Sequence, residues 1–489
     1  SPGDTPRPGS VDFGTGQEGL ATAILYRTDR EPLVGDEAVH EWGEATEQER
    51  RAYSLHIHFK PDIALSKDAA RWAEDFLRNV VVQWERRHVD LAPQERQVVI
   101  GVPSETDREY QQVLADLARR AGYGDVRTVD EPIGALLHHL HRRDLSVSEA
   151  QGGVLVVDFG GGTCDFAHMT RLEVRHSWGD MQLGGRLFDD LFYRWFLDQN
   201  PGAGERLDRE NAAYYVHWHL CRELKEQFSR TMARDRTETV RKRVGIYGTM
   251  DGLTWDEFIR RAHDYRPTTS FRNYLRHSGA PHAELTVGDL PHDLIDWFRG
   301  TMRQGLTAHG IDPADIQRVI LAGGSSQWPF VPDLIQDVLH LGEDSDVLLR
   351  SDRPYVAVGE GLAILPALQH RSETARKALK AGLPTFFEQR VRPLIDETVF
   401  EVGHMVARDT AAEFYDVHMR PILETFREEG GSFAELEDQI RESVEDHQEA
   451  YRDTLREHLS LLETGLPAQV QGAVAEWFAE HELPPTRQM

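Results

Sequence analysis

The sequence predicts an α/β protein built from two related lobes, followed by a region made only of helices. From residue 11 to about 370, short apolar runs typical of strands alternate with helical patterns. Beyond about 370 the strand signals stop, and Leu436, Ile440 and Val444 recur at helical spacing. Two Asp-Phe-Gly turns, which begin at Asp12 and Asp158, indicate that the architecture of the α/β part is duplicated.

Composition limits the kind of protein this is. The chain has 489 residues, enough for two or more domains, and 40% of them are hydrophobic, so a packed core is expected. The net charge of −27 argues against binding to nucleic acid or to anionic membrane surfaces, and no stretch is long and apolar enough to cross a membrane. Two cysteines and no recognisable secretory signal favour a cytoplasmic location.

Three segments are expected along the chain. Residues 1–10 are rich in Pro and Gly and predict a flexible lead-in, residues 11–370 form the α/β domain, and residues 371–489 form an acidic helical domain. The helical domain contains a weak repeat, since 386–398 and 414–426 align at a period of 28. Each copy carries Arg-Pro, which marks a helix restart or a kink unless the likeness is coincidental.

A glycine-rich turn follows the strand candidate at 154–158. Glycine is a poor strand residue, so Gly160, Gly161 and Gly162 are expected to end the strand in a tight turn. The bare backbone N–H groups of such a turn bind anions, usually phosphate, and Asp158 is suited to hold a hydrated Mg²⁺ beside it. The alternative is an ordinary hairpin turn.

Other turns have the same character. Asp12 heads a second candidate anion loop, in which Asp-Phe-Gly is followed by a hydroxyl and another glycine. One further turn follows a predicted strand at 319–322, and another precedes a helical run. The residues of these turns are Gly14, Thr15 and Gly16; Gly323, Gly324 and Ser325; and Gly184 and Gly185.

A candidate hinge lies between these turns in the sequence. Glu131 stands directly before Pro132 and a run of small residues that reads as a helix. Small residues let helices or backbones pack closely, which suits a pivot between two lobes.

In their order along the chain, these motifs resemble the nucleotide-binding domain of the 70-kDa heat-shock (DnaK-type) chaperones, within the actin-like ATPase superfamily. The turn at Asp12 is similar to the family's first phosphate motif, and residues 158–165 match the second almost letter for letter. Glu131-Pro132 resembles the first connecting motif, "VILAGGSSQWP" the adenosine motif, and "YVAVGEGLAIL" the second connecting motif. The resemblance covers roughly residues 11–368, and its specificity lies in five motifs in the right order.

The resemblance implies an ATPase that binds ATP or ADP with Mg²⁺ in a cleft between two lobes. It assigns the Mg²⁺ to Asp12 and Asp158, largely through water. It places Thr163 by the γ-phosphate, Glu131 at the attacking water, and Lys60 where transition-state charge develops. The alternatives are a solvated loop lysine for Lys60 and a helix N-terminal charge for Glu131.

The nucleotide contacts implied by the resemblance include departures from the family pattern. Arg222 stands where a glutamate is usual, Glu226 where an arginine is usual, and Gln327 where an arginine is expected near the adenine, so base selectivity is open. The expected nucleotide-binding residues are Gly14, Thr15, Gly16, Gly160, Gly161, Gly162, Gly184, Gly185, Lys225, Ser229, Gly323, Gly324 and Ser325.

The tail departs most from the family. A DnaK-type chaperone continues into a peptide-holding β-sandwich, whereas residues 371–489 predict only helices. We therefore expect an ATP-hydrolysing switch, monomeric or part of a hetero-complex, whose tail engages a protein partner; J-domain or nucleotide-exchange cofactors are candidate partners. The alternatives are a non-hydrolysing adaptor of the same fold and a small-molecule kinase of the same superfamily.

Overall fold

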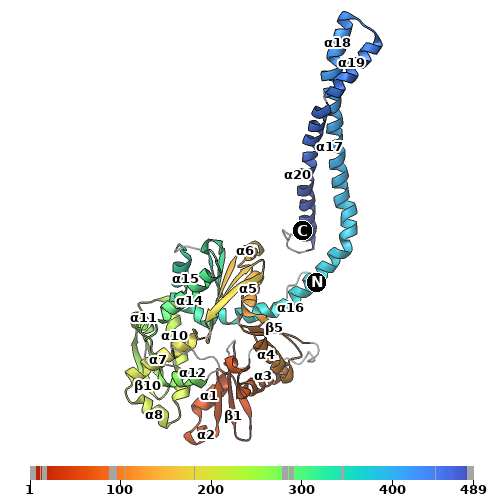
Figure 1. Cartoon of the computed structure of the whole chain (residues 1–489). Helices are drawn as coiled ribbons and strands as arrows, with labels where there is room; N and C mark the ends of the chain where they lie inside the picture. Colours follow the sequence, from red (N-terminus) through yellow and green to blue (C-terminus); the bar gives the residue numbers. More distant parts are fainter. Residues whose placement is uncertain are drawn as a thin grey trace. The chain divides into compact units, whose positions relative to one another are not determined.

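The computed structural model describes residues 7–11, 13, 19–87, 96–104, 106–180, 182–277, 285, 291–342, 346–446 and 448–481. Asp12, Gly14, Thr15 and Gly16 of the first expected phosphate loop lie outside the described residues. The chain separates into two compact units, Ser1–Ala367 (unit 1) and Leu368–Met489 (unit 2). Unit 1 is mixed α/β and unit 2 is helical (Figure 1). The roles expected for residues 1–10 (flexible lead-in), 11–370 (ATPase domain) and 371–489 (partner binding) stay predictions.

The largest sheet of unit 1 has five strands in the order β12-β11-β6-β7-β8. β6 (Val154–Phe159) is buried along its whole length, as its uninterrupted apolar run predicts. It pairs in parallel with β11 (Arg318–Ala322), with Asp158 opposite Ala322, and antiparallel with β7 (Cys164–Thr170). β12 (Leu348–Arg350) and β8 (Glu173–Asp180) form the two edges. The carboxyl ends of β6 and β11 therefore lie next to each other at the same end of the sheet.

Smaller sheets complete the strands of unit 1. An antiparallel sheet has the order β2-β1-β3, and a parallel pair joins β4 to β5. β9 and β10 form an antiparallel hairpin. The bounds are β1 (Ala23–Arg27), β2 (Arg30–Val34), β3 (Ser54–Ile57), β4 (Gln97–Val102), β5 (Asp125–Asp130), β9 (Val240–Val244) and β10 (Gly248–Leu253).

Helices pack against the sheets of unit 1 (Figure 1). The main core places aromatic residues of α7, α10 and α14 against β6 and β7, with Phe159, Phe188 and Phe298 fully buried. The helices are α1 (Asp36–Glu44), α2 (Glu47–Ala52), η1 (Lys60–Asp62), α3 (Lys67–Arg87), α4 (Arg108–Ala121), α5 (Glu131–Arg142), α6 (Val147–Gly152), α7 (Gly185–Gln199), α8 (Ala203–Arg209), α9 (Ala213–Tyr215), η3 (Val216–Leu220), α10 (Cys221–Arg234), α11 (Trp255–His263), α12 (Thr269–His277), α14 (Leu294–Ala308), η4 (Pro313–Asp315), η5 (Gly324–Gln327), α15 (Phe330–Leu339) and α16 (Pro354–Phe386).

α5 and the first turns of α16 cross at a contact between glycines. A Cβ atom added to Gly134 would lie 2.5 Å from the backbone oxygen of Val358, and one added to Gly361 would overlap the backbone oxygen of Gly134. The crossing is also bridged by His138 Nδ1, which lies 3.0 Å from Glu360 Oε2. The run of small residues after Glu131 thus permits backbone-to-backbone packing of two helices.

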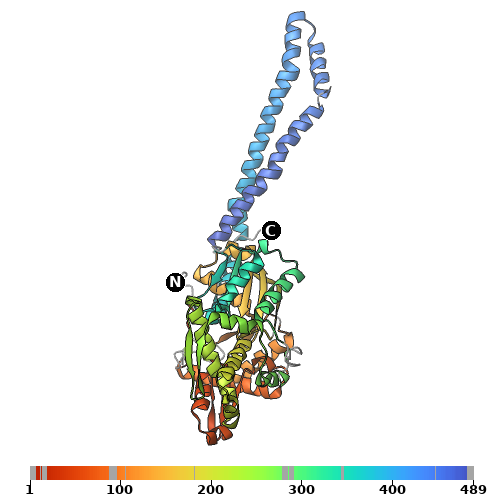
Figure 2. The same cartoon turned by 90° about the vertical axis from the view of Figure 1, so that its left-hand side faces the viewer.

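The regular elements in the described part of unit 2 are all helices, and residues 430–432 form the turn between α18 and α19. α17 (Arg392–Glu413) packs along α20 (Gln448–Glu480), and α18 (Arg420–Glu429) and α19 (Phe433–Asp446) form a hairpin at one end of this pair (Figures 1 and 2). Its core includes Phe386 stacked on Trp477, with ring centroids 4.2 Å apart. Within the described ranges of the whole chain, none of the helices combines the length and hydrophobicity needed to span a membrane.

The repeated Arg-Pro pairs of unit 2 have the same local structure. Each follows a π-helical turn, η6 (Phe387–Val391) before Arg392 and η7 (Phe414–Met419) before Arg420. A proline ring clashes with the carbonyl four residues earlier in an α-helix, and the wider π turn moves that carbonyl away. Each Arg-Pro therefore marks the start of a new α-helical segment, α17 or α18.

Candidate functional site

Two glycine turns lie side by side because β6 and β11 are parallel neighbours. The Ser325 hydroxyl donates a hydrogen bond of 2.8 Å to the backbone oxygen of Gly160. Gly323 has a φ of +76°, and an added Cβ atom would collide with the backbone of Phe159 and the carboxylate of Asp158. Only glycine fits at this position, which explains the close approach of the two turns.

Gly184 and Gly185 pack against the same turn. The Gly185 N–H donates to Gly160 O at 3.1 Å, and a Cβ atom added to Gly184 would overlap the backbone of Gly162. From α10, Lys225 Nζ donates to Gly185 O at 3.2 Å and pairs with Asp189 Oδ1 at 2.7 Å. The structure thus brings four separated segments of the chain into one cluster.

The 160–163 turn closes the β6–β7 hairpin and leaves donors unused. Gly160 N–H donates to Thr163 O at 3.0 Å. Within the described part of the chain, the N–H groups of Gly161, Gly162 and Thr163 make no hydrogen bond, and the space around Gly161 is open. The turn is a hairpin turn and also has the bare amides that an anion site needs.

Asp158 is a buried carboxylate, with 8% of its surface exposed. Among the described residues it has no hydrogen-bond or ion-pair partner. Burial raises the pKa of Asp158 well above its usual range, the Glu131 and Asp165 carboxylates raise it further, and Lys60 lowers it. A carboxylate in this position is suited to receive a cation.

Lys60 and Glu131 form an ion pair close to Asp158. Lys60 Nζ lies 3.2 Å from Glu131 Oε1, and the Tyr110 hydroxyl donates to the backbone oxygen of Lys60 at 3.2 Å. The charge of Glu131 is the largest cause of the raised pKa of Lys60. Glu131 is the first residue of α5, so the cluster adjoins the helix crossing of unit 1.

Two further carboxylates of this region were missed as candidate site residues by the sequence reasoning. Asp165 lies opposite Asp158 in the β6–β7 register and accepts a 2.7 Å hydrogen bond from the Thr163 hydroxyl. Asp180, opposite Cys164 on β8, accepts hydrogen bonds from the Gln182 and Leu183 amides and from the Trp297 indole. The signal was an Asp at a strand end shortly before Gly184-Gly185, which repeats the pattern of Asp158 before its glycines.

The residues that depart from the family pattern on α10 pair with each other. Arg222 Nε lies 2.9 Å from Glu226 Oε1, one helical turn away. Ser229, on the same helix, is buried, and Gln327 is the last residue of η5, which contacts α10. The charges at 222 and 226 therefore compensate within the helix.

The residues present fit a magnesium ion held largely through water. Asp158 offers a buried carboxylate that has no partner among the described residues, while its expected companion Asp12 lies outside them. In the described ranges, no group of three or more His, Cys, Asp or Glu side chains is arranged to hold a metal directly. A magnesium ion usually keeps several waters and needs only one or two carboxylates.

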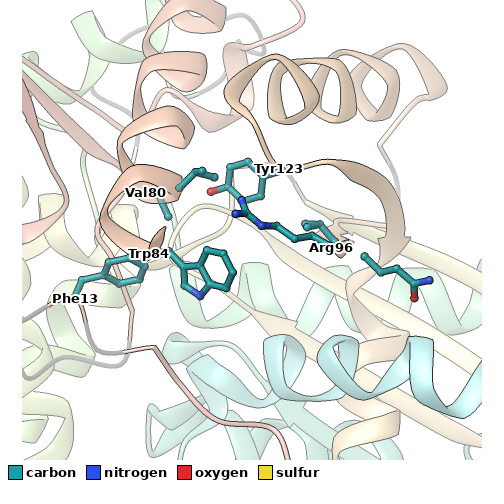
Figure 3. Close-up of a pocket in the computed structure, with 8 residues that line it drawn as sticks. Phe13, Val80, Trp84, Arg96 and Tyr123 are labelled. Carbon is teal, nitrogen blue, oxygen red and sulfur yellow. The ribbon is translucent and has the colours of Figure 1, made fainter. Parts of the chain in front are cut away.

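A separate apolar pocket of about 310 Å³ lies beside α3 and β4. Figure 3 shows Phe13, Val80, Trp84, Arg96 and Tyr123 around it. The Arg96 guanidinium lies over the Trp84 ring, 4.7 Å from its centroid. None of the lining residues belongs to the cluster around the 160–163 turn, so the pocket is not part of that site.

The arrangement defines a candidate phosphate-binding site at the carboxyl ends of two parallel strands. The family model of the Hsp70 protein matches residues 85–261, roughly a third of the chain. The match supports membership of the Hsp70 family, implies the actin-like ATPase fold and suggests a nucleotide-binding, chaperone-like function. It includes Glu131, Asp158 and Lys225, whereas Lys60 and Ser325 lie outside the matched segment.

Proposed function

We propose that the chain is an Hsp70-like protein that binds Mg-ATP, hydrolyses it and uses the nucleotide state as a conformational switch. The observation that carries the proposal is the convergence of the 160–163 turn, Gly184-Gly185, Lys225 and Ser325 beside the buried Asp158. Phosphoryl transfer to water requires charge neutralisation and alignment more than covalent help, and this cluster offers both.

The glycine turn supplies the phosphate contacts. The free N–H groups of Gly161 and Gly162 point to an anion-binding role toward β- and γ-phosphate oxygens. Thr163 belongs beside the γ-phosphate, and its hydroxyl is oriented by Asp165. Lys225 and Ser229 contact the adenosine part in this proposal, with Gly323, Gly324 and Ser325 closing the site from β11.

Hydrolysis depends on the charged cluster next to the turn. Glu131 orients or deprotonates the attacking water, for which it needs hydrogen-bond reach to that water. Lys60 stabilises negative charge in the transition state and holds Glu131 in place between turnovers. Magnesium, held through water by Asp158 together with Asp12, neutralises phosphate charge.

The glycine crossing of α5 and α16 gives the switch a pivot. Gly134 and Gly361 let two helices touch through backbone atoms, so a rotation there displaces little side-chain packing. Glu131 begins α5 and belongs to the charged cluster, so nucleotide contacts bear directly on this crossing.

We propose that residues 371–489 engage a protein partner, with J-domain or nucleotide-exchange proteins as candidates. Cys164 and Cys221 are both free and buried, which supports a reducing cytoplasm.

Phosphate release by Asp158→Asn and Glu131→Gln, beside the wild type, tests the hydrolytic part. We expect each substitution to lower the rate by about a hundredfold or more, because Glu131 acts on the attacking water and Asp158 holds the magnesium ion that neutralises phosphate charge. Glu205→Gln, an exposed carboxylate on α8, serves as the control and should leave the rate unchanged. Equal rates for all four proteins would overturn the proposal of hydrolysis.

A non-hydrolysing adaptor of the same fold is the second candidate function. It is favoured by the Arg222–Glu226 pair and by Gln327, because the arginines expected near the adenine are absent from positions 226 and 327. A phosphate-release rate no higher than that of Glu131→Gln, together with saturable nucleotide binding in calorimetry, would select this candidate.

A further inference from the structure

The end of unit 2 formed by α18 and α19 is a helix pair with no buried residue. None of the residues of Arg420–Glu429 or Phe433–Asp446 is fully buried. Phe433 is 82% exposed and Leu423 is 37% exposed. An amphipathic helix is stabilised by burying its apolar face, and this hairpin leaves part of that face in water.

Three apolar side chains of the hairpin form one surface, which we call the apolar tip: Leu423 and Phe433, which are exposed, and Phe426, which is half-buried. Leu423 and Phe426 lie one turn apart on α18 and therefore share a face. The Phe426 and Phe433 rings are 5.8 Å apart, which links α18 to the first residue of α19. The tip is thus continuous across the turn between the two helices.

Hydrogen bonds hold the backbone around the tip. Ser432 caps α19, since its hydroxyl accepts from Glu435 N–H at 3.2 Å and its N–H donates to Glu435 Oε2 at 2.9 Å. At the base of the hairpin, His418 Nδ1 lies 2.6 Å from the Ser443 hydroxyl. Hydrogen bonds therefore support the hairpin at the turn beside the tip and at its base.

The surroundings of the tip are strongly acidic. Residues 420–446 contain nine Asp and Glu against three Arg and Lys. Arg420 pairs with Asp416 and Arg441 pairs with Glu437, in each case with the residue four positions earlier in the chain. Carboxylates therefore outnumber cations on the hairpin that carries the exposed Phe433, which favours a cationic partner over an anionic one.

We propose that the apolar tip docks a basic amphipathic helix of a partner protein, with apolar residues of that helix on Leu423, Phe426 and Phe433 and its cations among the surrounding carboxylates. A second copy of this chain fits less well, because two acidic hairpins would repel each other. The inference rests on the part of the proposed function that assigns partner binding to residues 371–489, and it does not depend on hydrolysis.

The test uses the full chain and a labelled helical peptide of about 20 residues, made of Leu at helical spacing and Lys elsewhere. Fluorescence anisotropy should show saturable binding that weakens with added salt. The same peptide with Glu in place of Lys should not bind. We expect Phe433→Ser to weaken binding about tenfold, and Phe400→Ser, a matched substitution of a 75% exposed phenylalanine on α17, to leave it within about twofold.

The charge part of the inference has its own variant. The double substitution Glu424→Gln and Glu428→Gln should weaken binding and reduce its dependence on salt. Binding of both peptides alike, no binding of the basic peptide, or equal effects of Phe433→Ser and Phe400→Ser would each overturn the inference. So would sedimentation showing a dimer that Phe433→Ser dissociates, because the tip would then be covered by a second copy.

Phosphate release in the same samples separates this inference from the proposed enzymatic function. Phe433→Ser should leave the rate at the wild-type value, since the tip contributes no residue to the phosphate-binding cluster. Peptide binding by a protein without hydrolysis would retain the docking surface and reject only the ATPase.

Discussion

Asp158 shows how one residue can favour ligand binding at the expense of the ligand-free fold. Its carboxylate is buried and has no hydrogen-bond or ion-pair partner among the described residues, and burial raises its pKa well above the usual range. The folded protein therefore holds the proton more tightly than the unfolded chain does. Stability falls as pH rises from the unfolded pKa through the folded one, because the charge must then be buried.

Asp158→Asn is expected to stabilise the protein at about pH 8 without nucleotide or Mg²⁺, by on the order of 1 kcal/mol, since it removes a buried charge. The gain should shrink as pH falls and the wild-type carboxyl becomes neutral. Urea unfolding followed by tryptophan fluorescence at several pH values measures this. Asp125→Asn, exposed at the start of β5, is the control. A variant that is less stable than the wild type at high pH would contradict this account.

At the scale of helices, the crossing of α5 and α16 is held by glycines that cannot be enlarged. Gly361→Ala should destabilise unit 1 by about 1–3 kcal/mol, because the new methyl group overlaps the backbone of Gly134. Gly359→Ala, on the same helix, is the matched control, because an added Cβ there meets no atom within 4 Å. It should be neutral or stabilising by up to about 1 kcal/mol. Equal losses in urea unfolding for the two variants would show that the crossing is not tightly packed.

The strands at 154–158 and 319–322, with the glycine turns that follow them, could be predicted from local sequence. The run at 154–158 is apolar and β-branched without interruption, and the structure has β6 there with its glycine turn. The pairing of Lys60 with Glu131 could not be derived from spacing, because 71 residues separate them and only the tertiary fold brings them together. The Arg222–Glu226 pair could have been recognised from its i, i+4 spacing, once the segment was placed on a helix.

The tail shows a different limit of sequence reasoning. Helical spacing and the repeated Arg-Pro pairs predicted helices with restarts or kinks, and the structure has a π turn before each pair. Periodicity could not reveal which apolar residues remain exposed. Phe433 follows the same pattern as buried residues of other helices, yet it is 82% exposed because none of the described elements packs over it.

The two units have separate hydrophobic cores, which has a consequence for the whole molecule. Residues 1–367 contain nine of the ten tryptophans, and Trp477 belongs to the core of unit 2. A ligand that binds only unit 1 stabilises that unit by mass action. Mg-ADP at about 100 times its Kd should raise the unfolding free energy of unit 1 by about 2.7 kcal/mol.

Mg-ADP should therefore raise the midpoint temperature of thermal unfolding followed by tryptophan fluorescence. The midpoint temperature of the helical signal that belongs to unit 2 should not change. Circular dichroism in the far ultraviolet gives the second signal. A common shift of both transitions would mean that the units unfold as one, and no shift would mean that nucleotide does not bind.

Titration calorimetry of the wild type and Asp158→Asn with ATP, with and without Mg²⁺, tests the central claim most directly. The account predicts saturable binding at one site by the wild type, strengthened by Mg²⁺, and loss of that Mg²⁺ dependence in Asp158→Asn, because the variant lacks the carboxylate that receives the hydrated ion. Absence of binding by the wild type, or identical Mg²⁺ dependence in both proteins, would contradict a magnesium–nucleotide site at Asp158.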